Sequence, residues 1–389
     1  MITALGSACK FLNGGTPSKA VSSYFEGDIP WITSADIVGP IAGTARSFIT
    51  EEAIQKSATN KVTAGSVLLV TRTAVGKVAI AGTDLCFSQD ITALIPDRTK
   101  LDVGYLVQYL RTKQTHFERR ARGATIKGIT RDVVADLPIP FPPLPEQRRI
   151  AAILDQADAL RAKRRESLVQ LDSLTQSIFI EMFGDSATNP KGWVVNPLSN
   201  FILTVTNGLT RRRSESDEGT DIVLRLRDIR SGWIDFSDVN RITLEPSETK
   251  RFSVSSGDLL FIRVNGNPDY VGRCAIFKGH SEPVFFNDHI MRVKVDPTKI
   301  HSVFLAFLLN SNHGKNEIAK HRKTSAGQHT INQDGLGKIQ VPTPPVALQA
   351  EFVRRLENMG RQKNTFRESL AELDSLFASL QHRAFRGEL

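Results

Sequence analysis

Cysteine is scarce in this sequence, and long apolar runs are absent. The 389 residues include three cysteines, Cys9, Cys86 and Cys274, which are odd in number and far apart. Such spacing favours free buried thiols over a disulfide framework or a zinc site. No stretch approaches the run of about 18 apolar residues that a membrane span needs. The first residues, MITALGSACKFLNGG, also lack a charged and then apolar signal region. We therefore expect a cytoplasmic protein.

Catalytic motifs are scarce as well. Residues Asn265–Tyr270 contain NPDY, which is close to the N-P-P-Y type motif of adenine methyltransferases, but Asp269 replaces a proline. No glycine-rich turn between a strand and a helix is present to bind S-adenosylmethionine, so we interpret NPDY as a turn at a hairpin tip. The Glu248 to Lys250 segment lacks the Pro-Asp partner of a nuclease metal site, and the eight histidines have no metal-binding spacing. Nothing in the sequence indicates catalysis or a bound metal.

Positive charge, by contrast, is in excess. The chain has 50 Lys and Arg residues against 41 Asp and Glu residues, a formal net charge of +9. An excess of this sign favours a polyanionic partner. Nucleic acid is therefore the leading partner class. The length suits two domains of ordinary size with connecting elements.

An internal repeat spans most of the chain. RESLVQLDSL (165–174) is almost repeated as RESLAELDSL (367–376), and a shift of 202 positions keeps the two copies aligned without a gap. The ungapped agreement runs from Arg120, which falls on Arg322, to Phe183, which falls on Phe385. Within it a proline-rich hinge, PIPFPPL in the first copy and QVPTPPV in the second, precedes a long helical pattern.

Upstream of the hinges the register drifts, but similar segments still occur in pairs. The pairs predicted to be strands are 62–72 with 254–263 and 86–97 with 285–296. The pair predicted to be short apolar helices is 104–111 with 302–310. We therefore predict two globular parts of similar frame, each followed by a hinge and a helix.

The two long helices are expected from about Glu146 to Met182, with Gly184 as a stop, and from about Ala347 to Arg386. A helix of this length, roughly 50 Å, needs a partner. The other copy, packed antiparallel, is the favoured partner; the alternative is that each helix packs on its own domain. Polar residues on the apolar seam can set the register or dock other proteins; they are Arg164, Ser167, Gln362 and Ser369. The predicted interhelix packing residues are Ile150, Ile153, Ala157, Leu160, Leu171, Leu174, Ile178, Phe352, Met359, Phe366, Leu373, Leu376 and Leu380.

Basic segments lie at equivalent positions of the two copies. RRARGATIKGITR (119–131) and KHRKTSAGQHTIN (320–332) both precede a hinge, and their basic side chains and backbone amides suit phosphates. The segment 206–219 carries three consecutive arginines and is interpreted as a loop that reaches a duplex. The predicted DNA-contacting residues are Arg72, Lys77, Arg120, Arg122, Lys127, Arg211, Arg212, Arg213, Arg225, Arg227, Arg263, Asn265, Arg322, Lys323, Gln328 and His329.

The globular parts differ where they are expected to contact bases. Arg225 and Arg227 are predicted to alternate along a strand, DIVLRLRDIR. The corresponding segment of the first copy, GDIPWITSADI, has Thr33 and Ser34 in place of these arginines. Because arginine favours guanine whereas asparagine and glutamine favour adenine, different side chains at corresponding positions are typical of two different base-reading surfaces.

The segment 143–185 strongly resembles the central region of type I restriction-modification specificity subunits, and the stretch PPLPEQRRIAAIL (142–154), which overlaps its start, is typical of that family. The second copy departs from this pattern, because its segment Val346-Ala347-Leu348 lacks the Pro-Glu pair, but Gln349 is kept. The resemblance implies an α+β protein, with two pseudo-repeated globular α/β target-recognition domains joined by two long antiparallel, coiled-coil-like helices. The implied ranges are 1–144 and 186–345 for the domains and 145–185 and 346–389 for the helices.

The resemblance also implies a function and partners. Each domain is expected to bind one half of a bipartite target in double-stranded DNA, while the paired helices set the spacer. Two modification (methyltransferase) subunits and restriction subunits are the implied protein partners, and S-adenosylmethionine, ATP and magnesium would belong to them. The chain itself would then bind no cofactor and catalyse no reaction. The alternatives are a methyltransferase-associated domain with its own catalysis and a scaffold protein with two similar arms and no DNA role.

Overall fold

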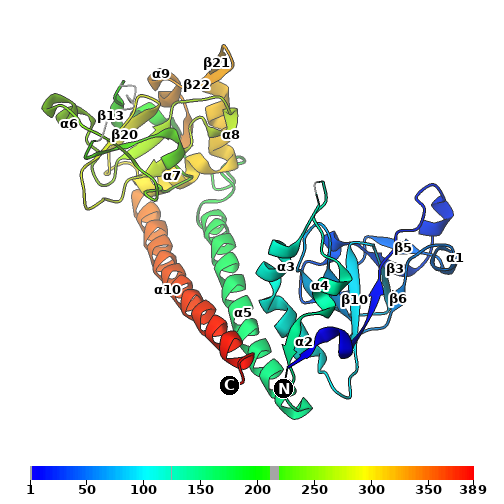
Figure 1. The fold of residues 1–389 in the computed structure, drawn as a ribbon. Coiled ribbons are helices and arrows are strands. Elements are labelled where there is room, and N and C mark those ends of the chain that lie inside the picture. Colours follow the sequence, from blue (N-terminus) through cyan, green and yellow to red (C-terminus); the bar gives the residue numbers. More distant parts are fainter. Residues whose placement is uncertain (1, 124, 211–218) are drawn as a thin grey trace. The chain divides into compact units, whose positions relative to one another are not determined.

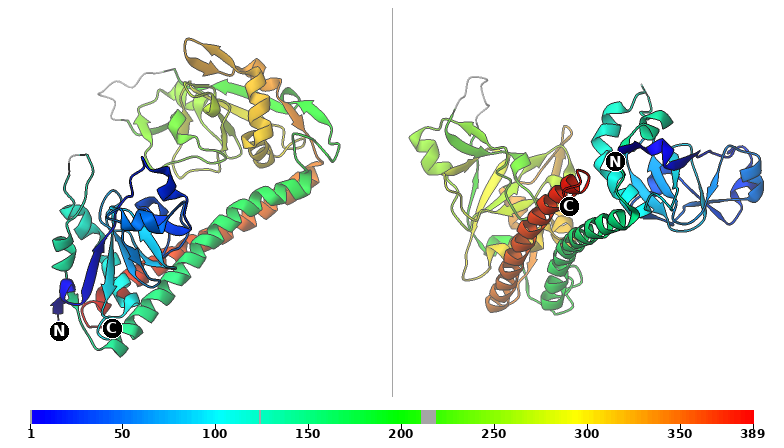
Figure 2. Two further views of the ribbon diagram at one scale, coloured as in Figure 1. Left: turned by 90° about the vertical axis from the view of Figure 1, so that its right-hand side faces the viewer. Right: turned by 60° about the horizontal axis from the view of Figure 1, so that its bottom comes forward.

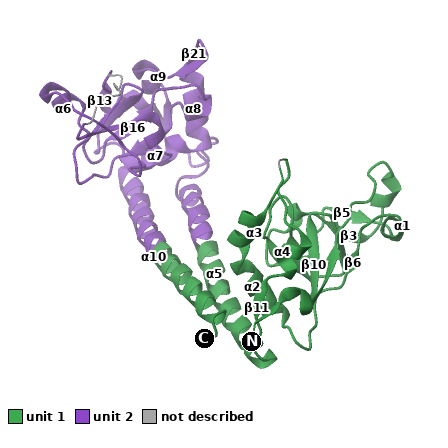
Figure 3. Cartoon of the chain, viewed as in Figure 1, with its two compact units in different colours: residues 1–167, 366–389 green, residues 168–365 purple. Residues whose placement is uncertain are grey.

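The chain forms two compact units, each of which combines β-sheets with helices. The computed structural model describes residues 2–123, 125–210 and 219–389. The first unit contains Met1–Ser167 and Phe366–Leu389, and the second contains Leu168–Thr365 (Figure 3). Two long helices, α5 (Leu144–Phe183) and α10 (Val346–Ala384), each contribute one part to each unit. The expected mixture of helices and strands is confirmed.

Two sheets form the globular part of the first unit (Figure 1). The first has the order β2-β10-β7-β8-β4, made by Cys9–Asn13, Ile91–Pro96, Val67–Val70, Val78–Ala81 and Ile41–Ala42. The second has the order β5-β3-β9-β6, made by Ser47–Ile49, Ile29–Ile32, Leu85–Phe87 and Lys61–Val62. The helices of this unit are α1 (Glu51–Gln55), α2 (Val103–Thr112), α3 (Gln114–Arg120) and α4 (Arg131–Ala135).

The central strand β7 is buried on both faces, which explains why its sequence, VLLV, is apolar without interruption. Val67 and Leu69 join a core that includes α2, whereas Leu68 and Val70 join the core shared with β9 of the second sheet. Successive side chains of a strand point to opposite faces, so one strand serves both cores. The segment 62–72 is thus a strand region as predicted.

Two sheets of the second unit repeat the strand order of the first, each with one edge strand fewer. Its main sheet is β13-β20-β16-β18, made by Ile202–Asn207, Ile290–Val295, Leu259–Ile262 and Cys274–Ile276. A smaller sheet is β15-β14-β19, made by Asn240–Ile242, Asp221–Leu224 and Val284–Phe286. A third, β17-β22-β21, is made by Val264–Asn265, Gln328–Thr330 and Lys323–Ser325. The helices are α6 (Pro246–Phe252), α7 (Ser302–Asn310), α8 (Asn312–His321) and α9 (Gln333–Gly337).

The central strand β16 repeats the arrangement of β7. Leu259 and Phe261 face the core that contains α7, while Leu260 and Ile262 face the other sheet. The paired segments predicted as short helices, 104–111 and 302–310, are helical in α2 and α7. Within the described residues, none of the helices is both long enough and apolar enough to span a membrane.

Each proline-rich hinge begins as a strand. β11 (Pro138–Pro140) pairs antiparallel with β1 (Ile2–Ala4), and β23 (Gln340–Pro342) pairs antiparallel with β12 (Val195–Pro197). Proline lacks an N–H group, so it is tolerated in such two-stranded edge pairings. The hinge is therefore anchored to the start of the globular part that it follows.

The long helices begin and end close to the predicted residues. α5 ends at Phe183, and Gly184 adopts φ +79° while its N–H donates to the Ile180 carbonyl at 2.8 Å. A glycine in this conformation ends a helix without the steric cost that a Cβ would bring. The predicted glycine stop is confirmed.

Both helix ends are embedded in the cores of the units. In the first unit Ile150 and Ala157 of α5 share a core with Phe377 and Ala384 of α10. In the second unit Phe183 lies 5.3 Å from Phe352 of α10 and 4.9 Å from Phe304 of α7, measured between ring centroids. Aromatic side chains thus hold the end of one helix and the start of the other against the same sheet.

The helix seam differs from the prediction at three leucines. Leu160, Leu174 and Leu376 were placed on the seam, but they are 49%, 45% and 51% exposed. A straight helix drifts from a heptad frame because it has 3.6 and not 3.5 residues per turn. Near the middle of the helices, the Arg161 guanidinium lies over the Phe377 ring at 4.2 Å, so a charged side chain occupies part of the seam.

The three cysteines are free and buried, as predicted. Burial raises the pKa of the Cys9 and Cys274 thiols to about 12 and that of Cys86 to about 11. The thiols therefore stay protonated and unreactive at neutral pH.

Replacing Phe183 with alanine should destabilise the second unit strongly. The substitution removes a buried ring that contacts Phe304 and Phe352, and such a cavity costs about 3–5 kcal/mol of the free energy of unfolding. Ile180→Ala, one turn earlier at a half-exposed position, should cost about 0.5 kcal/mol. Urea denaturation of the full chain followed by circular dichroism measures both. Equal midpoints for the two variants would contradict the role of the aromatic cluster.

Candidate nucleic-acid interface

In the first unit, three segments that were predicted to contact DNA meet beyond the end of β7. Arg122 and Gly128 form an antiparallel bridge, in which they exchange backbone hydrogen bonds of 2.9 and 3.0 Å. Arg72 forms an antiparallel bridge with Gly128, and the Thr73 N–H donates to the Lys127 carbonyl at 3.1 Å. The backbone therefore brings Arg72, Arg122 and Lys127, all exposed, onto one small ribbon.

The loop that follows β3 joins this ribbon. The Ser34 and Thr73 hydroxyls lie 2.9 Å apart, and Lys77 Nζ donates to the Ile37 carbonyl at 3.4 Å. Thr73 adopts φ +68°, which a β-branched residue rarely adopts. Strain of this kind clusters at functional sites. No pattern in the sequence indicated it, because glycine does not stand at this position.

Asp36 organises the loop after β3. Its carboxylate accepts the Thr33 N–H at 2.8 Å and Arg46 Nε at 2.5 Å. Desolvation opposes the charge, but the hydrogen bonds from Arg46 and Thr33 lower the pKa of Asp36 overall. The charged form is therefore kept at neutral pH, and the loop geometry with it.

In the second unit, the ribbon is a three-stranded sheet, β17-β22-β21, that projects from the globular part (Figures 1 and 2). Its turn, Ala326–Gly327, has φ +48° and +75°, the signs that a two-residue hairpin of type I′ needs. Four predicted residues lie on the ribbon: Asn265, Lys323, Gln328 and His329. His329 Nδ1 lies 2.8 Å from the Thr324 hydroxyl.

The two ribbons can be aligned through one backbone hydrogen bond. The Ile129 N–H donates to the Thr71 carbonyl and the Ile331 N–H donates to the Arg263 carbonyl, both at 2.9 Å. Ile129 and Ile331 are equivalent in the repeat, so Arg263 occupies the position of Thr71. Arg72 therefore has no arginine counterpart in the second unit, where Arg263 Nη1 instead donates to the Asp288 carbonyl at 3.0 Å.

The NPDY stretch lies in the connection between the antiparallel strands β16 and β18, as the turn interpretation requires. Residues Pro268–Tyr270 form a short 3-10 helix that the Asn267 side chain caps by accepting the Asp269 N–H at 3.0 Å. Arg322 Nη1 donates to the Pro268 carbonyl at 2.7 Å. Arg322 thus supports this connection, whereas its counterpart Arg120 is exposed at the end of α3.

The prediction that Arg225 and Arg227 alternate along a strand is wrong. β14 ends at Leu224, and the next residues form a 3-10 helix, Leu226–Asp228. The chain leaves the strand because the Asp228 carboxylate accepts the Arg225 N–H at 2.7 Å, as Asp36 accepts that of Thr33. Thr33 therefore corresponds to Arg225, but Ala35, and not Ser34, corresponds to Arg227.

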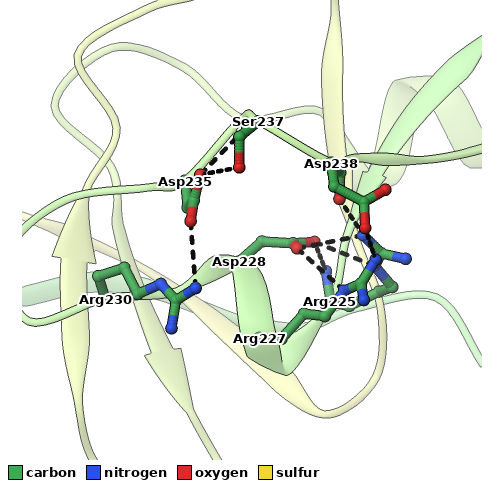
Figure 4. A network of polar contacts seen from close by, with 7 residues as sticks. All are labelled: Arg225, Arg227, Asp228, Arg230, Asp235, Ser237 and Asp238. Carbon is green, nitrogen blue, oxygen red and sulfur yellow. Dashed lines mark hydrogen bonds and ion pairs between the residues drawn. The ribbon is translucent and has the colours of Figure 1, made fainter. Parts of the chain in front are cut away.

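Both arginines take part in a network of acidic partners (Figure 4). Arg225 Nε lies 3.2 Å from Asp228 Oδ2, and its Nη2 donates to the Asp238 carbonyl. Arg227 pairs with the Asp238 carboxylate, and the side chains of both partners are more than half exposed. The guanidinium of Arg227 is thus held at the surface by a carboxylate that solvent also reaches.

The rest of the network stabilises the turn that carries Asp238. Hydrogen bonds from Ser237, and then from Arg230 at 3.1 Å, lower the pKa of Asp235 to about 2. The predicted arginines Arg211, Arg212 and Arg213 lie outside the described residues. Within residues 2–123, 125–210 and 219–389, no group of three or more His, Cys, Asp or Glu side chains is placed to hold a metal ion.

Comparison with known proteins identifies the family of this architecture. A family model described as the type I restriction modification DNA specificity domain matches residues 1–170 and 190–374. The specificity subunit of the type I restriction enzyme StySPI from Salmonella potsdam is 30% identical over 317 residues, which cover 76% of this chain and 67% of the relative. The corresponding EcoKI subunit of Escherichia coli K12 is 29% identical over 284 residues, which cover 69% of this chain and 61% of the relative.

Solved structures share the fold. The S subunit of a type I restriction-modification system from M. genitalium has a TM-score of 0.58 at 17% identity, covering 99% of this chain and 96% of that chain. A structure described in terms of the assembly and conformational transition of the type I system has a TM-score of 0.62 at 18% identity, covering 100% of this chain and 98% of that chain. With the family model matching most of its residues, the chain belongs to the type I restriction modification DNA specificity domain family.

Proposed function

We propose that this specificity subunit recognises a bipartite DNA target, with one unit bound to each half-site. Residues 1–144 and 186–345 are the two target-recognition domains in this proposal, and 145–185 and 346–389 are the helices between them. The observation that carries the proposal is the shared strand order of the two units, combined with different side chains at equivalent loop positions. A shared frame with different surfaces suits two different half-sites.

Three equivalent positions illustrate the difference. Thr33 corresponds to Arg225, Ala35 to Arg227, and Lys127 to His329. Arginine donates two hydrogen bonds to guanine in the major groove, whereas threonine or alanine contacts the thymine methyl group. The half-site bound by the second unit is therefore expected to contain guanine near Arg227.

The paired helices are proposed to set the spacer between the half-sites. In the first unit Arg161 Nε lies 2.6 Å from Asp374 Oδ1, and in the second Lys363 Nζ lies 2.7 Å from Asp172 Oδ1. The shift of 202 positions converts Arg161 to Lys363 and Asp172 to Asp374, so both ion pairs join the same two positions. An antiparallel helix pair with approximate two-fold symmetry explains this exchange.

A further contact supports the same register. The Arg164 guanidinium lies over the Phe366 ring at 4.3 Å, and these two residues are themselves equivalent in the repeat. Equivalent positions of two antiparallel helices meet only near their symmetry axis. Arg164, a polar residue of the predicted seam, therefore has a partner, Phe366, on the other helix.

The protein partners are proposed to be two modification (methyltransferase) subunits and the restriction subunits. S-adenosylmethionine, ATP and magnesium would be bound by those partners, and the chain contributes sequence recognition and no chemical step. Incorporation of labelled methyl groups into DNA by the isolated chain would show instead that the chain is itself a methyltransferase.

The chain should determine which sites are methylated in its host. A methylation map of cells that carry the chain and its modification subunit should show one gapped motif, absent from cells that lack only this chain. Long-read sequencing that detects modified bases gives both half-sites and the spacer. An unchanged map, with all subunits expressed, would refute the proposed role.

Removing two charges from the ribbon of the first unit should weaken binding to DNA. Arg122→Gln combined with Lys127→Gln should reduce the slope of log K against log salt by about 2, roughly 1 for each lost phosphate contact. Lys56→Gln, at the end of α1, is the control and should leave the slope unchanged. Fluorescence anisotropy with the assembled complex and a duplex of the mapped motif measures it. An unchanged slope in the double variant would exclude this ribbon from the interface.

Asp238→Asn should make binding tighter and less selective. The change removes the closer of the two carboxylates that pair with Arg227 and leaves only Asp228, 3.8 Å from Nε, so the guanidinium can turn toward phosphates of any sequence. Affinity for a duplex without the motif should rise about three- to tenfold, which is comparable with one added phosphate contact. Glu372→Gln, on α10, removes the same charge as a control. Equal effects of both changes would show that only net charge matters.

A further inference from the structure

The first turn of each long helix carries a glutamine that is fully buried. Gln147 in α5 and Gln349 in α10 have no exposed surface, and the shift of 202 positions superimposes one on the other. Glutamine is seldom buried completely unless its amide group is hydrogen-bonded. The neighbouring residues differ, with Pro145 and Glu146 in the first copy and Ala347 and Leu348 in the second. The glutamine is therefore the part of this turn that both copies share.

The Gln147 amide joins three segments of the first unit. Its Oε1 accepts the Asp102 N–H at 2.9 Å, and Asp102 is the N-cap of α2. Its Nε2 donates to the Lys100 carbonyl at 2.9 Å and to the Pro142 carbonyl at 2.8 Å. One side chain thus ties the first turn of α5 to the hinge and to the globular part.

The Gln349 amide does the same in the second unit. Its Oε1 accepts the His301 N–H at 2.8 Å, and His301 is the N-cap of α7. Its Nε2 donates to the Pro344 carbonyl, which is equivalent to that of Pro142, at 2.8 Å. The same connection is therefore made twice with different surrounding side chains.

These hydrogen bonds constrain the direction of the helix axis as well as the distance of the helix from its domain. Donors and acceptors of one planar amide face fixed backbone groups, so α5 cannot rotate about its axis or tilt without leaving buried polar groups unpaired. A helix of 40 residues is about 60 Å long. A tilt of roughly 3° at its start displaces its far end by about 3 Å, close to the rise of ~3.4 Å per base pair.

We propose that Gln147 and Gln349 are positioning residues, which fix the direction in which each long helix leaves its target-recognition domain and thereby the spacer length that is accepted. This inference rests on the proposed function, because a spacer has meaning only for a bipartite target. Each glutamine acts through the helix and contacts no DNA. Their loss should change the spacer lengths of the targets that are methylated, and should not change the base sequence of the half-sites.

The test uses Gln147→Met and Gln349→Met, which keep the side-chain volume and remove the hydrogen bonds. Gln156→Met, at an exposed position of the same helix α5, is the matched control. Each variant is assembled with its modification subunit and incubated with a pool of duplexes that carry the mapped half-sites separated by spacers one or two base pairs shorter or longer than the native one. Methylation of each duplex is counted by sequencing. Thermal denaturation of each variant is measured in parallel.

The expected result is that methylation at spacers changed by one base pair rises about tenfold relative to the native spacer in both glutamine variants, with the half-sites unchanged. Gln156→Met should behave as the wild type. A uniform loss of methylation at every spacer, or an unchanged spacer profile in folded protein, would overturn the inference and leave a purely structural role. Gln349→Met loses fewer hydrogen bonds, so it provides the answer if Gln147→Met does not fold. A wild-type complex that methylates no gapped motif would instead refute the proposed function.

Discussion

Both faces of one central strand are buried in each unit, and the placement of the candidate interface depends on this constraint. β7 and β16 can carry only apolar side chains, because every position contacts one of two cores. Polar chemistry is therefore possible only where the strand leaves the cores, and Arg72 and Arg263 lie within two residues of that point. The strand thus delivers its first charged side chain to the edge of the unit, and in the first unit the ribbon and the loop after β3 of the other sheet meet it there.

The buried ends of the long helices contribute most to stability, whereas the charged contacts near their middle set the alignment of the two helices. Aromatic and aliphatic side chains such as Phe183 and Phe352 bury the ends, and burial of this kind is strong but not directional. Near the middle, charged contacts such as those of Arg161 with Asp374 are partly exposed, so they contribute little to stability. They are directional, however, and disfavour a shifted alignment of the two helices, which apolar contacts alone would tolerate.

The sequence repeat predicted the helices, their glycine stop and the paired strands, because these depend on local periodicity and on end signals that neighbouring residues supply. It did not predict the ion pair of Arg227 with Asp238, which lies 11 positions further along the chain, nor the exposure of Leu160, which a heptad frame places on the seam. The three-stranded ribbon was also missed, since β17 lies more than fifty residues before β22, with which it pairs.

The ribbon in each unit is held to the rest of the protein mainly by backbone hydrogen bonds, such as those from Ile129 to Thr71 and from Ile331 to Arg263. Backbone pairing tolerates many side chains, so residues on the ribbon can be replaced without disturbing either core. Under the proposed function, new target sequences are then accessible through a few substitutions on a frame that does not have to be rebuilt. In that case the evolution of specificity is separate from the maintenance of the fold.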